Sequence, residues 1–323
     1  MHIIVTGAAG FIGSNLSDEL LRLGHKVTGI DNFSYGSVSN IQHLRKNKDF
    51  SLLEKDVRDP ATFSGQHGDM IVHLASQKIP RYSNSLRTLD DNSAMLQNVV
   101  AKAVGDKLKI FYASTSDVYG KNPHVPYTEQ SNFLLGPSTV KRWAYALSKI
   151  YGEHYLIANA AENELEFSVG RFFGSYGTNQ NTTWWGGPQS VFIQNILENK
   201  PLELHGDGLQ TRTFTYIADT VQGIIKCLFD SAAKNEIFNI ANEADEEITI
   251  KDLALLIWKM MNGEDSIPNI KLIPYSTFGN YEDVMRRVPS IEKIKSTLGF
   301  KPMFPLAEGL KRTIQWQTNL FNS

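Results

Sequence analysis

The sequence predicts an α/β protein in which a doubly wound parallel sheet is joined to a smaller C-terminal α/β lobe. Short β-branched segments alternate with amphipathic helical patterns through the first half of the chain, as expected for βαβ units. After about Arg171, glycines and Pro188 interrupt this alternation. We therefore expect a first domain over residues 1–172, with segments near 215–242 returning to it, and a second lobe formed mainly by residues 173–323.

The periodicity of apolar residues gives the expected elements in order. In the first domain the expected strands span residues 3–5, 26–30, 51–54, 70–74 and 109–113. A helix is expected over 13–23, because its leucines fall on one face at helical spacing. In the second half we expect helices over 190–199, 251–261 and 306–319 and a strand over 236–240.

The composition excludes several classes of protein. The 323 residues include 32 Lys and Arg against 34 Asp and Glu, so no basic excess points to nucleic acid or an anionic membrane. Apolar runs such as 253–258 are too short to cross a bilayer, and residues 1–13 do not resemble a signal peptide. The single cysteine, Cys227, cannot form an internal disulfide, and no Cys/His cluster has metal-ligand spacing. We expect a cytoplasmic enzyme or binding protein without a metal site.

A glycine-rich turn follows the first expected strand and opens a helix. The spacing of Gly7, Gly10 and Gly13 suits a tight turn, close approach of a pyrophosphate and packing of the helix on the strand. The helix N-terminus, which includes Phe11 and Ile12, offers unpaired N–H groups and a partial positive charge to phosphates. This segment therefore predicts a dinucleotide-binding site.

An acidic residue ends the second expected strand about 20 residues further on. Asp31 is placed to accept hydrogen bonds from the adenosine ribose hydroxyls and to repel a 2′-phosphate. The alternative is that Asp31 only stabilises the turn at the end of the strand. Together with the glycine turn, it predicts NAD rather than NADP as the cofactor.

Tyr145 and Lys149 are four residues apart and lie on one face of an expected helix. A phenol with a pKa near 10 is a poor base at neutral pH, but a neighbouring ammonium and a positive nicotinamide ring would lower that pKa. Tyr145 would then take a proton from a sugar hydroxyl while hydride leaves for NAD. A core tyrosine beside a surface lysine is the alternative, and the dinucleotide turn upstream disfavours it.

Hydroxyl and carboxyl groups follow the expected strand over 109–113. Ligands of open parallel sheets bind beyond the carboxyl ends of the strands, so Thr115, Ser116 and Asp117 lie where a substrate is expected. Thr115 is a candidate to hydrogen-bond the hydroxyl that is oxidised, and Asp117 to act as a base on a carbon acid beside a ketone. The alternative is a capped turn with an Asx interaction.

These motifs resemble those of the extended short-chain dehydrogenase/reductases, the NAD-dependent nucleotide-sugar epimerase/dehydratase family. The resemblance runs through nearly the whole chain in the family's order. The matching segments are residues 6–13, 31–33, 56–59, 73–76, 113–120, 145–149, 171–177, 205–219 and 298–302. It implies a Rossmann-like NAD-binding domain, a nucleotide-sugar lobe, and a homodimer formed by helices near 92–104 and 143–161 that pack as a four-helix bundle.

The resemblance also implies positions for residues around the cofactor and the substrate. Tyr145 and Lys149 belong to both the catalytic and the cofactor set. The further cofactor positions are Asn32, Asp56, Val57, Leu74, Ala75, Ser76 and Lys78, with Lys78 close to the NAD phosphates or the substrate. The implied substrate positions are Arg81, Ser116, Gly174, Arg212, Arg286 and Arg287, where Arg212 and one of the last two would bind the diphosphate. Asp219 is expected to cap a helix.

The residues around Thr115 leave several reactions open. Family members begin by oxidising the sugar at C4, which makes C5 epimerisation, dehydration or loss of a C6 carboxylate accessible. Ser116 and Asp117 match the decarboxylases best, whereas the segment 75–81 resembles dehydratases of UDP-N-acetylglucosamine. We expect chemistry at C5 and C6 of a UDP-N-acetylhexosamine, as dehydration or epimerisation, first, UDP-glucuronate decarboxylation second and 4-epimerisation third.

Two further points remain open from the sequence. The intact Thr115, Tyr145 and Lys149 argue against a catalytically silent NAD-binding regulator, which is the alternative of a different class. Trp184 and Trp185 lie in a glycine-rich segment and could either form the floor of a sugar site or close the core.

Overall fold

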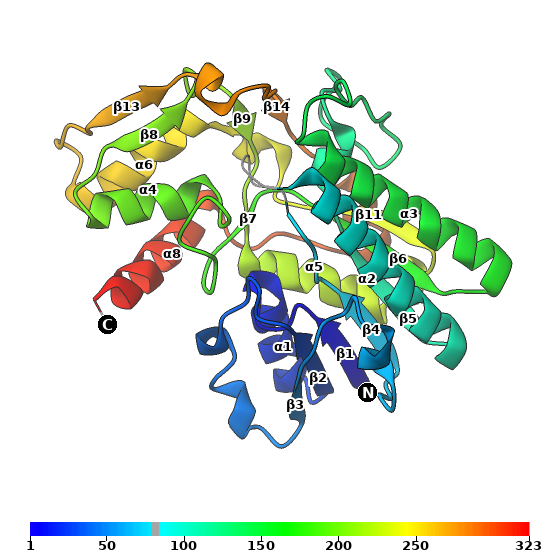
Figure 1. The fold of residues 1–323 in the computed structure, drawn as a ribbon. Coiled ribbons are helices and arrows are strands. Elements are labelled where there is room, and N and C mark those ends of the chain that lie inside the picture. The colour runs from blue at the N-terminus through cyan, green and yellow to red at the C-terminus, as the bar shows by residue number, and fades with distance from the viewer. Residues whose placement is uncertain (79–83, 323) are drawn as a thin grey trace.

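The computed structural model describes residues 1–78 and 84–322, and its centre is a seven-stranded parallel sheet covered by helices (Figure 1). The strand order is β11-β6-β5-β4-β1-β2-β3. These strands are β1 (His2–Thr6), β2 (Lys26–Asp31), β3 (Phe50–Glu54), β4 (Met70–His73), β5 (Lys109–Thr115), β6 (Phe167–Phe172) and β11 (Glu236–Ile240). Every pair is parallel, which confirms the predicted doubly wound α/β class.

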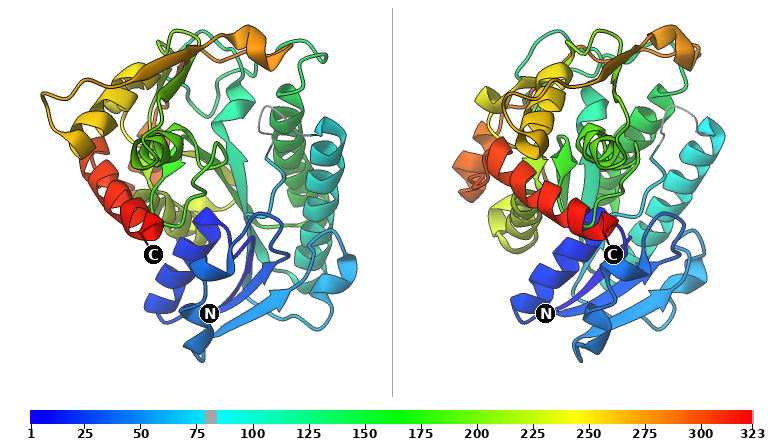
Figure 2. Two further views of the ribbon diagram at one scale, coloured as in Figure 1. Left: turned by 60° about the vertical axis from the view of Figure 1, so that its left-hand side comes forward. Right: turned by 90° about the vertical axis from the view of Figure 1, so that its left-hand side faces the viewer.

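Helices bury both faces of the sheet, and alternate residues of each strand point to opposite faces. Ile3 and Val5 of β1 pack with Leu16, and Ile4 between them packs with Leu96 in a separate cluster. The helices on the first face are α1 (Phe11–Arg22) and α5 (Ile217–Phe229). Those on the second are α2 (Ser85–Asp106) and α3 (Trp143–Asn163), which lie side by side (Figures 1 and 2).

Among the described residues, three small sheets and three α-helices make up the expected second lobe. These helices are α4 (Pro188–Leu197), α6 (Ile250–Asn262) and α8 (Leu306–Phe321), whereas α7 (Glu292–Leu298) packs against β11 of the main sheet. The strands are β7 (Ser175–Tyr176), β8 (Leu202–His205), β9 (Thr211–Arg212), β10 (Thr215–Tyr216), β12 (Ile248–Thr249), β13 (Ile270–Ile273) and β14 (Arg286–Arg287). Figure 2 shows α8 running from this lobe towards α1. Residues 236–240, as predicted, form a strand, and β11 adds to the main sheet beside β6.

Two local expectations need correction. The strand expected to end at residue 113 continues to Thr115, because β5 keeps its pairing with β6 as far as Phe172. Asp219 does not cap a helix, since it lies within the first turn of α5. Its carboxylate accepts hydrogen bonds from the N–H groups of Met303 at 2.8 Å and Phe304 at 3.0 Å, and so holds the segment before α8.

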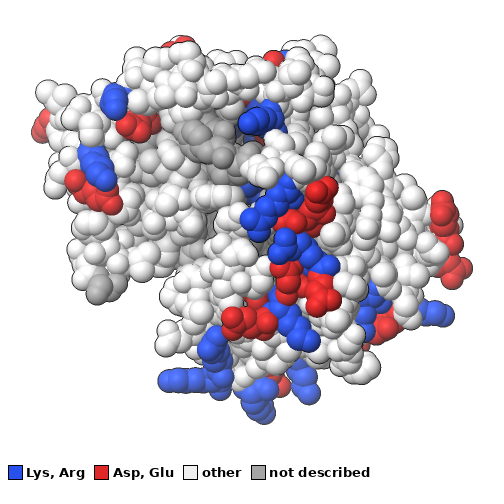
Figure 3. Space-filling model, in the orientation of Figure 1, with Lys and Arg blue, Asp and Glu red and all other residues white. Residues whose placement is uncertain are grey.

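Charged side chains of both signs lie on the molecular surface (Figure 3). On the face shown in Figure 3, acidic and basic side chains are intermixed, in keeping with the formal charge of −2. In the described part of the chain, no helix is long and apolar enough to span a membrane.

Candidate functional site

The glycine turn leaves the N-terminus of α1 open to a cavity. Gly7 has φ +74°, and a Cβ there would lie 2.9 Å from the backbone nitrogen of Ala75. Gly10 precedes α1, and a side chain on Gly13 would collide with the carbonyl group of Gly7. Only glycine therefore lets the first turn of α1 pack this closely on β1, with its N–H groups facing the cavity.

Asp31 ends β2 below this turn and is almost fully buried. Its Oδ2 accepts a hydrogen bond from the Ala9 N–H at 2.9 Å, and its Oδ1 accepts one from the Phe33 N–H at 2.8 Å. Burial raises the pKa of Asp31, although both backbone hydrogen bonds oppose that effect. Asp31 therefore stabilises its own turn, and it also faces a small cavity whose wall includes Asn32, Asp56 and Val57.

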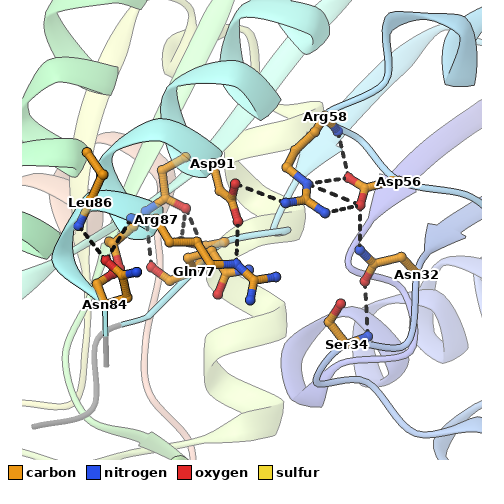
Figure 4. Close-up of polar contacts among 12 residues, drawn as sticks. Asn32, Ser34, Asp56, Arg58, Gln77, Asn84, Leu86, Arg87 and Asp91 are labelled. Carbon is orange, nitrogen blue, oxygen red and sulfur yellow. Dashed lines mark hydrogen bonds and ion pairs between the residues drawn. The ribbon is translucent and has the colours of Figure 1, made fainter. Parts of the chain in front are cut away.

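Asn32, Asp56 and Arg58 in the wall of that small cavity belong to a network of polar side chains (Figure 4). Asp56 accepts hydrogen bonds from Asn32 at 2.9 Å and from Arg58 at 2.6 Å, and the Arg58 guanidinium lowers the pKa of Asp56. Arg58 also pairs with Asp91 of α2 at 3.0 Å. The network fixes the rim where the adenine end of a dinucleotide would lie.

A larger cavity of about 840 Å³ lies between the sheet and the second lobe. It shares Gly7, Gly10, Leu74 and Ser76 with the small cavity, so the two cavities adjoin at the N-terminus of α1, where the phosphates of a dinucleotide would lie. Ala75 faces the small cavity, and Lys78 lies at the larger one. The residues present therefore fit NAD, with adenosine at Asp31 and nicotinamide in the larger cavity.

Tyr145 and Lys149 project from α3 into the larger cavity. Burial raises the pKa of Tyr145, and hydrogen bonds to Thr115 and Ser76 only partly oppose this. Lys149 donates to the Ala113 carbonyl oxygen at 2.8 Å, its Nζ is 5.9 Å from the centre of the Tyr145 ring, and burial lowers its pKa to about 7. For the protein alone, the pKa of Tyr145 is therefore raised and not lowered. The expected lowering would also need the positive nicotinamide ring.

Thr115 and Asp117 stand at the carboxyl end of β5, where the chain enters the short helix η4 (Ser116–Tyr119). Thr115 accepts a hydrogen bond from the Asp117 N–H at 3.2 Å, which is the capped turn considered as an alternative. The Asp117 Oδ1 also contacts Arg142 at 3.1 Å and Arg287 at 2.8 Å. Burial alone would raise the pKa of Asp117, but the two guanidinium groups outweigh it and hold the pKa at about 2.

Arg142 is a site residue that the sequence analysis missed. It precedes α3, and its guanidinium lies 5.0 Å from the centre of the Trp143 ring. Besides Asp117, it donates to the Glu282 carbonyl oxygen at 2.6 Å and approaches Asp283 at 3.4 Å. Its position three residues before Tyr145 was the available signal, but its partners lie far away in the sequence.

The three candidate diphosphate arginines separate in the structure. Arg212 pairs with Asp283 at 3.0 Å, and Arg212 and Arg287 both line the larger cavity. Burial lowers the pKa of Arg212 to about 10, with repulsion from Arg287 as a further cause. Arg286 instead points outwards and pairs with Glu247 at 2.7 Å. Of the two adjacent arginines, the structure therefore places Arg287 at the cavity.

The remaining candidates have separate outcomes. Ser116 accepts a long hydrogen bond of 3.5 Å from Arg287. Gly174 lines the larger cavity with φ +51°, and a Cβ there would lie 2.8 Å from the Phe214 ring, which explains glycine at this position. Arg81 lies outside the described residues.

Trp184 and Trp185 both line the larger cavity, so they do not close the core. Trp184 stacks on His205 of the second lobe, with ring centres 4.4 Å apart. Trp185 lies against Tyr35 of the loop after β2, at 4.5 Å, and its carbonyl oxygen accepts a hydrogen bond from Lys78 at 3.3 Å. The segment therefore bridges the two lobes beside the dinucleotide cleft.

Comparison with known proteins agrees with this geometry. The model of the NAD-dependent epimerase/dehydratase family matches residues 3–241. The chain is 32% identical to the UDP-N-acetyl-alpha-D-glucosaminuronate decarboxylase of Bacillus cytotoxicus over 99% of this chain and 98% of that protein. It is 35% identical to UDP-glucuronic acid decarboxylase 1 of Danio rerio over 98% and 72%.

Solved structures share the whole fold. UDP-glucose 4-epimerase of Thermotoga maritima superposes with a TM-score of 0.87 at 28% identity, covering 99% of this chain and 100% of that one. UDP-glucuronic acid 4-epimerase of Bacillus cereus, in complex with UDP-glucuronic acid and NAD, gives 0.87 at 26% identity with the same coverage.

Proposed function

The chain belongs to the NAD-dependent epimerase/dehydratase family, and from this membership and the charges of its cleft we propose that it decarboxylates a UDP-hexuronate. The candidate substrates are UDP-N-acetylglucosaminuronate and UDP-glucuronate. The reaction oxidises C4 of the sugar, removes the C6 carboxylate as carbon dioxide and then returns the hydride to C4, so that bound NAD is regenerated and the product is a UDP-pentose.

One observation carries the proposal, the position of Asp117 between Arg142 and Arg287. Dehydration or epimerisation through C5 needs a base at C5, and a carboxylate with a pKa of about 2 is a weak one. Decarboxylation needs no base at C5, because the carbon–carbon bond supplies the electron pair. Its substrate needs cations for the carboxylate, and those are present.

Arg142, Arg212 and Arg287 line the larger cavity together with Lys78, and they face the carboxylates of Asp117 and Asp283. These named cations and carboxylates leave a net charge of +2, which matches a diphosphate, so a further substrate carboxylate is balanced only when Asp117 gives up its negative charge. We assign Arg212 to the diphosphate and, in place of the expectation from the sequence that Arg286 or Arg287 joins it there, we assign Arg287 together with Arg142 to the sugar. The carboxylate of a uronate would pair with Arg142 and Arg287. A neutral hexose has no anionic group to offer these two arginines.

The residues at the carboxyl end of β5 and on α3 serve the step at C4. In this proposal Thr115 hydrogen-bonds the C4 hydroxyl and Tyr145 takes its proton. NAD, when bound, accepts the hydride from C4. The Lys149 Nζ lies 5.9 Å from the centre of the Tyr145 ring, and its positive charge would stabilise the phenolate as the proton leaves.

From the sequence, dehydration or epimerisation of a UDP-N-acetylhexosamine is the first expectation and decarboxylation of UDP-glucuronate the second. The arginines around Asp117 support the reverse order, as does the similarity to two decarboxylases. The N-acetyl group of the first expectation is retained in one of the two candidate substrates.

The proposal is tested by incubating the NAD-loaded protein in deuterated water with UDP-glucuronate, UDP-N-acetylglucosaminuronate, UDP-glucose and UDP-N-acetylglucosamine. We expect carbon dioxide release and a product with deuterium at C5 from a uronate only, as followed by NMR. Conversion of a neutral sugar, or C4 inversion of a uronate with its carboxylate retained, would overturn the proposal. The Tyr145→Phe variant is the control for turnover by contaminants.

We further propose that the protein is a homodimer in which α2 and α3 of each subunit pack as a four-helix bundle. Leu147, Tyr151 and Ile157 of α3 are apolar or aromatic side chains that are 50%, 36% and 47% exposed in the single chain. Tyr151 also accepts a hydrogen bond from Gln97 of α2 at 3.1 Å, so both helices contribute to this face. Light scattering should give twice the mass of one chain, and Leu147→Glu should shift the protein to monomer.

A further inference from the structure

The Asp117 carboxylate occupies a site between two arginines that could hold a different anion. Its Oδ1 lies 3.1 Å from an Arg142 nitrogen and 2.8 Å from an Arg287 nitrogen, and its side chain is 21% exposed towards the cavity. The Arg287 Nε is buried and has no hydrogen-bond partner among the residues that the structure describes. Arg287 therefore has capacity left for a second acceptor beside Asp117.

Several elements contribute the charged and titratable groups that face Asp117. They are Arg142 and Tyr145 at the start of α3, Arg287 of β14 and Lys78 after β4. Arg142 also has Asp283 as a neighbour, so it stays compensated if Asp117 moves away. Arg287 has no such second carboxylate among the ion pairs described, and it would need a replacement anion.

On the basis of the proposed decarboxylation, we propose that the sugar carboxylate takes the place of Asp117 between Arg142 and Arg287. The displaced Asp117 picks up a proton from water and later donates it to C5. Asp117 is thus both the occupant of the carboxylate site and the acid that completes the reaction.

The exchange follows from electrostatics. Two carboxylates beside the same pair of arginines repel each other, so Asp117 leaves. Its displaced carboxylate is then buried and lies next to the negative charge of the substrate carboxylate. Both effects favour its protonated form, so Asp117 would be neutral while the substrate carboxylate is bound. Asp117, which is a weak base while it contacts the two arginines, thus becomes a proton donor when the substrate displaces it.

The protons and electrons of the step balance. With C4 oxidised, the C5–C6 bond breaks, carbon dioxide leaves, and the electron pair forms the C4–C5 double bond of an enolate. The Asp117 O–H proton goes to C5 and the C4 ketone reforms. The loss of the substrate carboxylate leaves Arg142 and Arg287 without their anion, and the newly ionised Asp117 returns to them. The proton taken from water at binding is the one that replaces the carboxylate in the product.

The first test measures protons at binding, before any chemistry. NAD-loaded Tyr145→Phe protein is titrated calorimetrically near pH 7 with UDP-glucuronate and with UDP-N-acetylglucosaminuronate, in buffers of different ionisation enthalpy. We expect about one proton taken up per site with the uronate that is a substrate, and none with UDP-glucose. The double variant with Asp117→Asn should take up none. Tight uronate binding without proton uptake would overturn the inference.

The affinities distinguish displacement from a merely structural role of Asp117. If the substrate must displace Asp117, Asp117→Asn removes a competing anion and should bind the uronate at least as tightly as the parent protein. UDP-glucose should bind equally to both. Weaker uronate binding in Asp117→Asn would contradict the exchange.

The last test follows the two halves of the reaction. In a single turnover, Asp117→Asn should still release carbon dioxide, whereas protonation at C5 should slow by about 10²-fold or more. Asp117→Glu, which keeps a carboxyl group, should recover much of the loss. Product formation at the normal rate in Asp117→Asn would refute the acid role. If the wild-type protein released no carbon dioxide from either uronate, the proposed function would fail instead, and the two failures are therefore distinct.

Discussion

The cofactor half and the substrate half of the cleft are built in different ways. The cofactor half uses backbone groups and conformations from short stretches of chain, as in the turn from Gly7 to Gly13 and in Asp31 at the end of β2. The substrate half uses charged side chains that neutralise one another, and Asp117, Arg142 and Arg287 come from three distant segments.

The difference has a functional consequence. A backbone cradle allows few substitutions, because a Cβ at Gly7 or Gly13 meets other backbone atoms. A cluster of compensated charges can exchange one anion for another, as proposed for Asp117. A common cofactor site can therefore be combined with substrate sites of varied chemistry, consistent with the range of enzymes that share this fold.

The largest effect is expected where the two halves meet. Tyr145→Phe removes the hydroxyl that we propose takes the C4 proton, and turnover should fall by about 10²–10⁴-fold. NAD binding, followed by fluorescence or calorimetry, should stay nearly unchanged, because the ring and Lys149 remain. Activity close to the wild-type level would exclude Tyr145 as the proton acceptor.

Lys149→Met should be inactive but more stable than the wild type at low pH. The pKa of Lys149 is about 7 in the folded protein against an ordinary value of 10.5, so below pH 7 the folded state bears the full cost of a buried charge. Between these values the unfolded chain binds more protons, and wild-type stability rises with pH. At about 1.4 kcal/mol per pKa unit, the variant should gain a few kcal/mol near pH 6.

Denaturant unfolding of the NAD-free proteins from pH 6 to 10 measures this difference. The gap between Lys149→Met and the wild type should narrow steadily as the pH rises. A gap that is independent of pH would show that Lys149 is not held near neutrality by burial.

Arg212→Ala should weaken UDP binding by roughly 10- to 150-fold, which corresponds to about 1.5–3 kcal/mol for hydrogen bonds to a charged group. NAD affinity should not change, because Arg212 belongs to the substrate half. Arg286→Ala is the matched control, since Arg286 points outwards and pairs with Glu247. Equal losses in the two variants, measured by calorimetry with UDP, would remove Arg212 from the diphosphate site.

The same contrast explains which features could be predicted from the sequence. The glycine turn, Asp31 and the Tyr145–Lys149 pair depend on spacing within one turn or one helix, so their geometry follows from local rules. Arg142 precedes Tyr145 by only three residues, but it becomes a site residue through Asp117 and the segment 282–283, which the fold brings to it. Likewise, the sequence does not distinguish Arg286 from Arg287. In the structure Arg286 points outwards, whereas Arg287 lines the cavity.

Asp31→Ala is expected to reduce NAD affinity by about tenfold, or roughly 1.5 kcal/mol, and to diminish the preference for NAD over NADP. We propose that the carboxylate binds the ribose hydroxyls of NAD and repels a 2′-phosphate. Because Asp31 accepts hydrogen bonds from Ala9 and Phe33, Asp31→Asn serves as the control that keeps part of this turn. An unchanged NAD to NADP ratio in both variants would contradict the assignment.

The smallest effect concerns the bridge between the two halves. Trp185 contacts Tyr35 across the dinucleotide cleft, and aromatic pairs contribute about 0.5–1.5 kcal/mol beyond their buried area. Trp185→Ala should therefore speed NAD dissociation by roughly 2- to 10-fold. Trp184 stacks on His205 of the second lobe instead, so Trp184→Ala should leave NAD dissociation unchanged and weaken nucleotide-sugar binding. Stopped-flow release of NAD from both variants compares the two tryptophans directly, and faster release from Trp184→Ala than from Trp185→Ala would reverse the assignment of each to its half.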